Sequence, residues 1–393
     1  MNTHFSAFER TLHLERYPAK HQHVSLQAWD SADEYIIQHI EDCNLISTSS
    51  EKSSNKDTPL IILNDEFGAL SCWFHSAKPV FISDSWISHK SLMTNMLIND
   101  LNPESITFCD ALTNLATLMP AAPKLVLLKI PRSLALLEYQ LINLSKVINE
   151  DTKVVAAGKV KSVQNSVLKL FEKHIGKTTT SLAKKKSRLI FSQFETKEPH
   201  VSPYPSIVED PLIPFALHNH ANVFCRDHLD IGARILLKNL PNAEGARVID
   251  LGCGNGVLGV SILDKYKDAH VTFVDESFMA IESAKQTLLA HLGSLDRASF
   301  FVSNCLEEVL KEEPRDYSLV LCNPPFHQQN AVTDHVATQM FSDSKSALKQ
   351  GGELRIVGNR HLDYHQKLKK LFGGYQVIDS NKKFSVLSTY KAR

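Results

Sequence analysis

The chain has 393 residues, no net formal charge and no stretch near the roughly 20 apolar residues of a membrane span, which predicts a soluble protein of two domains. Its seven cysteines are scattered and never spaced as CxxC, and no HExxH motif organises its eighteen histidines, so we expect neither a disulfide framework nor a bound metal. The N-terminal residues lack the apolar core of a secretory signal, so we expect a cytoplasmic protein whose nucleic-acid contacts, if present, come from local basic patches.

The first half of the chain predicts a parallel α/β domain. Its apolar runs suit buried strands and lie within 59–71, 78–86 and 124–133. The stretch 47–58, STSSEKSSNKDT, is polar and of low complexity, which is typical of a surface loop.

A basic segment closes this first half. Residues 153–188 contain ten lysines and arginines against one acid, Glu172. Isolated lysines of this kind often belong to a solvated helix face. The compact group near the end of the segment instead predicts contacts with the phosphates of RNA, which give affinity without sequence information. Its members are Lys184, Lys185, Lys186 and Arg188.

Prolines mark the boundary between the two halves. Five of them fall between residues 199 and 214, too many for a helix or a central strand. We therefore predict a linker at 199–217 between domains at 1–198 and 218–393.

The second half alternates short apolar runs with amphipathic helical patterns, which is typical of βαβ units and a parallel sheet. Strands are predicted at 247–251, 270–275, 299–303, 318–322 and 353–358, with a closing hairpin within 375–390. Helices are predicted at 277–292 and 334–350, the second ended by Gly351 and Gly352. A second, weaker basic group comprises HQKLKKLF (365–372), Lys382, Lys383 and the final YKAR.

The two halves resemble each other. Segments 59–71, 78–86 and 124–133 match 246–259, 270–277 and 318–327 in the same order. This predicts two related α/β domains in tandem. An ungapped pairing places Asn64 and Glu66 at two glycines of the second copy, and Lys129 at Asn323, so we expect the first copy to have lost its chemistry.

A glycine-rich loop, DLGCGNG at 250–256, follows a predicted strand and opens a helix, where a doubly wound sheet binds nucleotide-like ligands. Gly252, Gly254 and Gly256 permit a tight turn and close approach of the ligand. The dinucleotide fingerprint GxGxxG fails because position 257 is valine, which disfavours an oxidoreductase.

Two acids complete the predicted cofactor site. Asp250, at the head of the loop, suits the ammonium and sulfonium of S-adenosylmethionine, and Asp275 ends the next strand, where it can accept both ribose hydroxyls. Asn304 follows the third strand and is predicted to contact the adenine, although an ordinary polar strand end would look the same.

The motif NPPFH ends the fourth strand. An aromatic exocyclic amine is a poor nucleophile, because its lone pair is delocalised into the ring. We predict that the Asn323 side-chain oxygen and the Pro324 carbonyl accept its two hydrogens, and that Phe326 stacks on the base for about 1–3 kcal/mol. Pro325 and His327 are predicted to line the same pocket. Asn-Pro alone would be a turn, and His327 alone a surface histidine.

With these motifs the chain resembles the bacterial ribosomal RNA guanine-N2 methyltransferases, whose active-site motif is NPPFH. The resemblance covers nearly the whole chain and is closest to the branch that modifies large-subunit (23S) RNA. It implies two tandem class I methyltransferase-like (Rossmann-like) domains, the N-terminal copy degenerate and without cofactor binding, with S-adenosylmethionine as cofactor. We further expect the N-terminal domain to bind RNA, from its basic segment, and the protein to be a monomer. The resemblance also implies that Phe224, within 218–227, contacts the methionine end of the cofactor.

Other interpretations remain open from the residues alone. The related motif (N/D)PP(Y/F) also serves amine or amide methylation of DNA adenine and protein glutamine, although the aromatic there is commonly tyrosine. A small-subunit RNA methyltransferase and a non-catalytic RNA-binding or assembly factor would share the fold. Intact DLGCGNG and NPPF motifs argue against the non-catalytic reading. The choice of guanine over adenine depends on the family resemblance.

Overall fold

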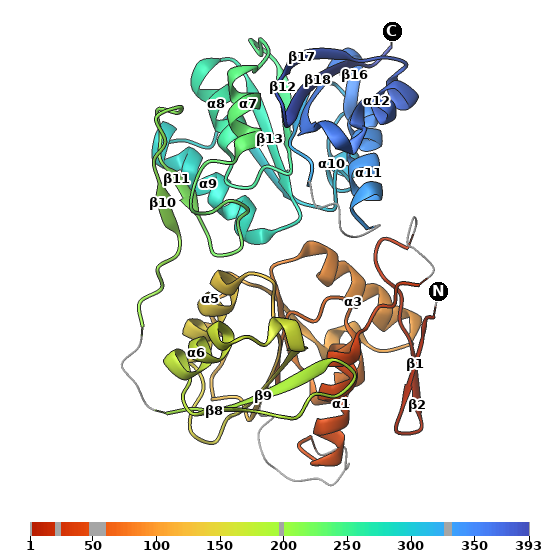
Figure 1. Cartoon of the computed structure of the whole chain (residues 1–393), viewed down its shortest axis with the longest axis vertical. Helices are drawn as coiled ribbons and strands as arrows, with labels where there is room; N and C mark the ends of the chain where they lie inside the picture. The colour runs from red at the N-terminus through yellow and green to blue at the C-terminus, as the bar shows by residue number, and fades with distance from the viewer. Residues whose placement is uncertain (1, 20–24, 47–59, 196–199, 326–331, 393) are drawn as a thin grey trace. The chain divides into compact units, whose positions relative to one another are not determined.

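The computed structural model describes residues 2–19, 25–46, 60–195, 200–325 and 332–392. The chain forms two compact units, Met1–Pro203 and Tyr204–Arg393, each with its own seven-stranded sheet (Figure 1). The boundary between the units falls within the proline-containing stretch 199–217. In the described ranges, no helix has the length and apolar character needed to cross a membrane.

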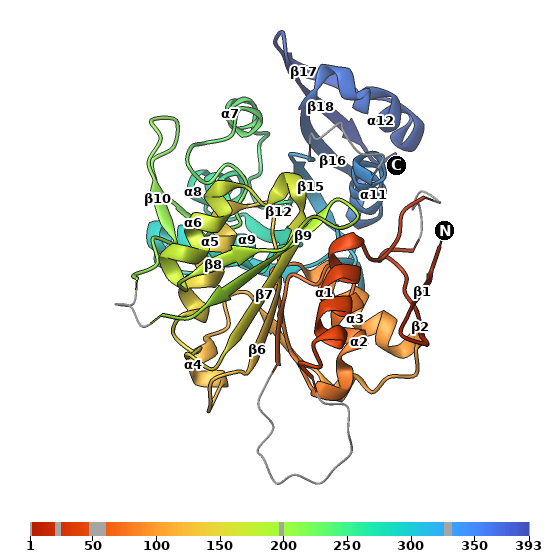
Figure 2. The same ribbon diagram turned by 60° about the horizontal axis from the view of Figure 1, so that its bottom comes forward.

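The N-terminal unit begins with a hairpin and continues as alternating strands and helices, with α1 on one face of its sheet and α5 and α6 on the other (Figure 2). The hairpin is β1 (His4–Ala7) and β2 (Arg10–His13). The sheet strands are β3 (Leu60–Leu63), β4 (Val80–Ser83), β5 (Thr107–Asp110), β6 (Leu125–Lys129), β7 (Lys153–Lys159), β8 (Thr178–Thr180) and β9 (Ser187–Gln193). The helices are α1 (Ser31–Asp42), α2 (Ala69–Trp73), α3 (Trp86–Ile98), α4 (Leu115–Leu118), α5 (Leu134–Leu144) and α6 (Asn165–His174).

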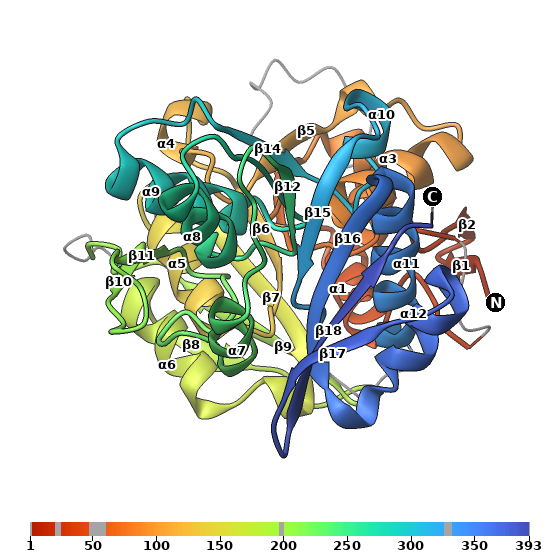
Figure 3. The ribbon, with the colours of Figure 1, turned by 90° about the horizontal axis from the view of Figure 1, so that it is seen from above.

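The C-terminal unit begins with a short antiparallel ribbon, β10 (Ser206–Val208) and β11 (Leu217–Asn219). Its sheet strands are β12 (Arg247–Leu251), β13 (His270–Asp275), β14 (Ala298–Val302), β15 (Tyr317–Cys322), β16 (Leu348–Asn359), β17 (Gln376–Ser380) and β18 (Phe384–Tyr390). Its helices are α7 (Ile231–Lys238), α8 (Val257–Lys265), α9 (Phe278–Leu292), α10 (Val309–Glu312), α11 (Val332–Ala347) and α12 (Tyr364–Phe372). Figure 3 shows α7, α8 and α9 on one face of this sheet and α11 and α12 on the other.

The two sheets share one topology. The strand orders are β5-β4-β3-β6-β7-β9-β8 and β14-β13-β12-β15-β16-β18-β17, so each strand has a counterpart at the same place. In both sheets the first five strands are parallel, and a closing hairpin joins through an antiparallel strand. The carboxyl ends of the parallel strands therefore meet at one edge, where ligands of open α/β sheets bind. This confirms the predicted α/β fold with two tandem methyltransferase-like domains.

One predicted helix end is wrong. The helix predicted at 334–350 ends at Ala347, before the two glycines. Leu348 already pairs with Tyr317 of β15 and is fully buried, so sheet pairing overrides the local helical pattern. A side chain at Gly352 would place its Cβ 2.9 Å from the Tyr317 carbonyl oxygen, which shows that the glycine serves strand pairing.

In the N-terminal unit, the carboxyl edge of the sheet is closed by its own side chains. Lys129 Nζ, at the end of β6, lies 2.8 Å from Asp30 Oδ1 and 2.6 Å from Asp33 Oδ1. Burial alone would lower the pKa of Lys129, but the Asp33 and Asp30 carboxylates offset it and raise the pKa. Beside it, Asn64 and Gln140 exchange hydrogen bonds of 2.8 and 2.9 Å. At the position that pairs with Asn323, the structure therefore has a lysine that is paired with two carboxylates.

Replacing Lys129 with alanine should strongly destabilise the N-terminal unit, because Asp33, only 5% exposed and with a pKa that burial raises to about 7, would lose the cation that stabilises its ionised form. We expect the free energy of unfolding to fall by about 3–5 kcal/mol, measured by chemical denaturation. Lys124→Ala, at an exposed position just before β6, is the control and should have little effect. Equal stability of the two variants would contradict the role of this ion pair.

Candidate functional site

The glycine loop joins β12 to α8 at the carboxyl edge of the C-terminal sheet. Gly252, Gly254 and Gly256 have φ angles of 71°, 54° and 79°, a region that residues with a side chain rarely adopt. The amides of Gly252 and Cys253 both donate to the Val274 carbonyl, at 2.8 and 3.0 Å. These bonds fix the loop against the end of β13.

The loop glycines serve different purposes. A Cβ at Gly256 would lie 2.8 Å from Ala284 Cβ, so this glycine lets α8 pack against α9. A Cβ at Gly254 would meet nothing within 4 Å, so this glycine leaves open space above the loop. In the N-terminal copy the packing glycine is retained as Gly68, whose Cβ would lie 2.9 Å from Leu92 Cα. The glycine that faces open space is the one replaced, by Glu66.

The two predicted carboxylates lie beneath and beside this loop. Asp275 accepts from Gly254 N at 3.0 Å, and Asp250 Oδ2 accepts from Gly259 N at 2.8 Å. The other oxygen, Asp250 Oδ1, is buried and has no hydrogen-bond partner among the described residues. Burial raises the pKa of Asp250 to about 7, and the nearby Asp275 adds to this shift. A buried carboxyl in this state would gain a favourable charge interaction from a cationic ligand.

Two more predicted cofactor residues lie in this unit. Asn304, which follows β14, is buried and donates from Nδ2 to Glu307 Oε1 at 2.6 Å. Segment 218–227 is tied to the glycine loop, because Asn255 Nδ2 donates to Asn219 Oδ1 at 2.9 Å. Phe224, within this segment, has a side chain that is 56% exposed.

Asn323 follows β15, and its amide has a defined orientation. Its Nδ2 donates to Asp230 Oδ2 at 3.0 Å, and the same Asp230 oxygen accepts from Ala233 N at 2.9 Å as the N-cap of α7. A carboxylate only accepts, so it must face the NH₂ group of the amide. Asn323 Oδ1 is therefore left as the acceptor; it is buried and has no partner among the described residues.

The rest of the NPPFH motif is only partly described. Pro324 is buried and Pro325 is exposed. The Pro325 carbonyl accepts from the Tyr364 hydroxyl at 3.3 Å, which ties this turn to α12. The predicted residues Phe326 and His327 lie outside the described residues.

Sequence reasoning missed Asp230 and Tyr364. An N-cap aspartate can be read from LDIGAR, where it precedes an amphipathic helix, but its partner lies 93 residues later. The N-terminal unit contains a corresponding pair, because Asp30, the N-cap of α1, accepts a hydrogen bond from Lys129 as Asp230 does from Asn323. Only the folded pair shows the correspondence.

Of the predicted RNA-binding residues, Lys184, Lys185 and Lys186 lie at the turn that enters β9, and Arg188 is the second residue of that strand. The three lysines are exposed and Arg188 is half-buried. Lys184 bonds Gln38, and Lys185 Nζ lies 2.6 Å from Glu34 Oε2, both on α1. The count of acids within 153–188 missed Glu34, which the fold brings to this turn. An exposed pair of this kind contributes about 0–1 kcal/mol and leaves the lysines able to exchange it for a phosphate.

The residues on the carboxyl edge of the C-terminal sheet fit S-adenosylmethionine. There is open space over Gly254, an unpaired buried oxygen on Asp250 and a carboxylate at the end of β13. In the part of the chain that the structure describes, no group of three or more His, Cys, Asp and Glu side chains could hold a metal ion.

Comparisons with known proteins agree with this geometry. Residues 2–196 match the family described as RLMG N-terminal domain, and residues 214–388 match the methyltransferase small domain. The chain is 50% identical over 399 residues to ribosomal RNA large subunit methyltransferase G of Pseudoalteromonas atlantica, covering 100% of both chains. Against the protein of the same name from Aeromonas salmonicida it is 48% identical over 382 residues, covering 97% of both.

A solved structure shares the two-domain architecture. The 16S rRNA N2 methyltransferase RsmC of T. thermophilus, in complex with AdoMet and guanosine, aligns with a TM-score of 0.74. The alignment covers 99% of this chain and 97% of that one, at 19% identity. At this identity the likeness establishes the fold.

Asp230→Ser should separate capping from amide orientation. Serine still caps α7, so stability should change by less than about 1 kcal/mol. Its shorter side chain cannot accept from both Ala233 N and Asn323 Nδ2 as Asp230 Oδ2 does, so the Asn323 amide loses its fixed orientation, and we expect kcat to fall about 100-fold with unchanged cofactor affinity. Single-turnover kinetics measures kcat, and calorimetry measures stability and cofactor affinity. Asp227→Ser, at an exposed position nearby, is the control, and wild-type turnover in Asp230→Ser would refute the orienting role.

Alanine at two loop glycines should give opposite phenotypes. Gly254→Ala should weaken S-adenosylmethionine binding at least tenfold and cost about 1–2 kcal/mol of stability, because only its backbone conformation is strained. Gly256→Ala should cost about 2–5 kcal/mol, because its Cβ also collides with Ala284. Thermal unfolding and calorimetry distinguish the two, and equal losses of stability would contradict the assignment.

Cofactor binding should depend on the ionisation of Asp250. With a pKa of about 7 before binding, this carboxyl is neutral at lower pH and must lose its proton to pair with a cation. Affinity for S-adenosylmethionine should therefore rise from about pH 5.5 to about pH 7.5, by at most about tenfold per unit. Asp250→Asn keeps the bond from Gly259 N and should flatten the profile. If wild type and Asp250→Asn show the same pH dependence of affinity in titration calorimetry, Asp250 is excluded as the titrating group.

Proposed function

The chain belongs to the family of ribosomal RNA large subunit methyltransferase G, and we propose that it methylates the exocyclic N2 amine of a guanine in 23S ribosomal RNA. The observation that carries this proposal is the acceptor Asn323 Oδ1, which Asp230 orients at the strand end beside the glycine loop. S-adenosylmethionine is the methyl donor of the proposed reaction.

The N2 amine must recover a nucleophilic lone pair. Asn323 Oδ1 and the Pro324 carbonyl accept its two hydrogens, which draws the nitrogen towards a tetrahedral geometry with its lone pair outward. Because Asp230 already orients the amide and the two prolines stiffen the turn, little reorganisation is needed at the moment of reaction. The amine becomes acidic as the new bond forms, so alignment matters more than a strong base. Phe326 stacks on the guanine, with Pro325 and His327 lining the pocket.

The other side chains hold the cofactor opposite this amine. Asp250 would face its positive charge, and Asp275, at the end of β13, would accept hydrogen bonds from the ribose hydroxyls. Asn304 would contact the adenine, and Phe224 would contact the methionine end. Gly252, Gly254 and Gly256 allow the backbone to approach it closely.

The domains divide the work. Residues 218–393 form the catalytic domain, 199–217 the linker and 1–198 an RNA-binding domain. In the first domain, Lys129 and its two carboxylate partners occupy the strand end at which the catalytic domain has Asn323. The first domain therefore lacks the amine acceptor, and its contribution is affinity for the RNA substrate. Lys184, Lys185, Lys186 and Arg188 contact RNA phosphates. We further propose a monomeric cytoplasmic enzyme that needs no metal.

The decisive experiment incubates the protein and labelled S-adenosylmethionine with ribosomal RNA from cells that lack the enzyme, then identifies the methylated nucleoside. Label in N2-methylguanosine of 23S RNA supports the proposal. Label in adenine, in 16S RNA or only in protein would overturn it. Asn323→Ala should abolish transfer while cofactor binding stays near normal.

Reversing the charge of Lys184, Lys185 and Lys186 to glutamate should weaken 23S RNA binding and flatten its salt dependence, because phosphate contacts are lost. A filter-binding titration at several salt concentrations measures both effects. The matched control reverses Lys124, Lys146 and Lys153, which are exposed elsewhere on the same unit. If both triple variants weaken binding equally, general charge rather than this turn is responsible.

A further inference from the structure

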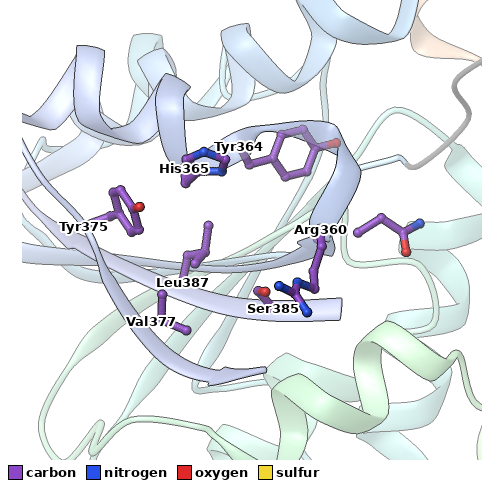
Figure 4. A pocket seen from close by; sticks show the side chains of 9 residues that line it. Arg360, Tyr364, His365, Tyr375, Val377, Ser385 and Leu387 are labelled. Atoms are coloured by element: carbon purple, nitrogen blue, oxygen red, sulfur yellow. The ribbon is translucent and has the colours of Figure 1, made fainter. Parts of the chain in front are cut away.

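A groove lined by Tyr364, which bonds the Pro325 carbonyl, lies between α12 and the closing hairpin of the C-terminal sheet. Its cavity has a volume of about 210 Å³. Figure 4 shows Tyr375 and His365 towards one end, Arg360 towards the other, and Val377 and Leu387 along the strands between them. None of these residues has a role in the proposed transfer.

The groove and the active site share a wall. Strands β15 and β16 are parallel neighbours, with Cys322 paired to Ile356, so their carboxyl ends lie at the same edge. Tyr364 lines the groove and donates its hydroxyl to the Pro325 carbonyl at 3.3 Å. A chain that places one nucleotide at Asn323 would therefore meet this groove with a neighbouring nucleotide.

One end of the groove is basic and hydrogen-bonding. Arg360 is exposed, and its backbone amide donates to the Lys383 carbonyl at 3.0 Å, which brings the lysines of the β17–β18 turn beside it. Asn359 Oδ1, in the lining, is buried without a partner among the described residues. A phosphate suits the guanidinium, and a base edge or sugar hydroxyl suits the amide oxygen.

The other end offers rings and apolar surface. The His365 and Tyr375 rings are 5.8 Å apart with planes tilted by 54°. Tyr375 is 38% exposed, and Val377, on the exposed edge strand β17, is 57% exposed, so both side chains offer surface to a ligand. Single-stranded bases bind to such aromatic platforms through their faces.

We propose that this groove holds a nucleotide next to the target guanine, its base against Tyr375 and His365 and its phosphate at Arg360. The inference rests on the proposed function and extends it to recognition of the RNA strand around the target. Positive charge at one end and an exposed ring at the other fit RNA better than an apolar protein segment.

The test compares Arg360→Ala and Tyr375→Ala with wild type on protein-free 23S RNA that lacks the modification. We expect KM for RNA to rise about 5- to 50-fold, with KM for S-adenosylmethionine within twofold, as for loss of one stacked base or one phosphate contact. Arg360→Ala should also reduce the salt slope of RNA binding by about 0.7–0.9. Tyr375→Phe keeps the ring and should behave as wild type.

Matched controls are Arg315→Ala and Tyr390→Ala, exposed residues at the amino edge of the same sheet. If the groove variants behave like these controls while wild type methylates the RNA, the groove inference is overturned and the proposed function stands. If the groove variants lose activity only on assembled ribosomal subunits and not on protein-free RNA, the groove binds a ribosomal protein, and the proposal that it holds a nucleotide is overturned. RNA binding by each variant is also measured without cofactor, and this measurement tests the groove independently of methylation. If wild type does not methylate the RNA, only the proposed function is contradicted.

Discussion

A hydrogen bond between a helix-capping aspartate and the residue that ends the fourth strand organises the carboxyl edge in both domains. In the C-terminal domain Asp230 holds the Asn323 amide and leaves one oxygen as an acceptor. In the N-terminal domain Asp30 holds the Lys129 ammonium, with Asp33 completing the ion pair. The same capping geometry thus orients a neutral amide in one copy and holds an ammonium in the other.

The glycines of the two loops explain how the N-terminal domain can keep the fold while its loop sequence changes. Gly68 and Gly256 are both required for close helix packing, so the sheet topology depends on them. A Cβ at Gly254 would meet no neighbour within 4 Å, so this glycine is not needed for helix packing, and its counterpart is Glu66. A domain can therefore lose its cofactor loop and keep its core, which leaves its surface available for holding RNA in the proposed division of work.

Sequence patterns located the strands of the C-terminal sheet closely, because its buried strands are short apolar runs bounded by turn residues. The strands predicted at 247–251 and 270–275 match β12 and β13 at both ends. The C-terminal end of the helix predicted at 334–350 was wrong, because Leu348 pairs with β15, and this long-range contact decides its conformation. The basic segment was read without Glu34, because that residue reaches Lys185 only through the fold.

By itself, the sequence determined the domain number, the topology class and the loop and strand-end motifs, since these are local patterns of apolar residues, glycines and prolines. Tertiary structure alone decided what each motif residue faces. Asp230 orients Asn323, Tyr364 supports Pro325, and Lys129 is an internal cation. Such roles depend on partners that are distant along the chain, so no local pattern contains them, and the buried environment that makes them matter exists only after folding.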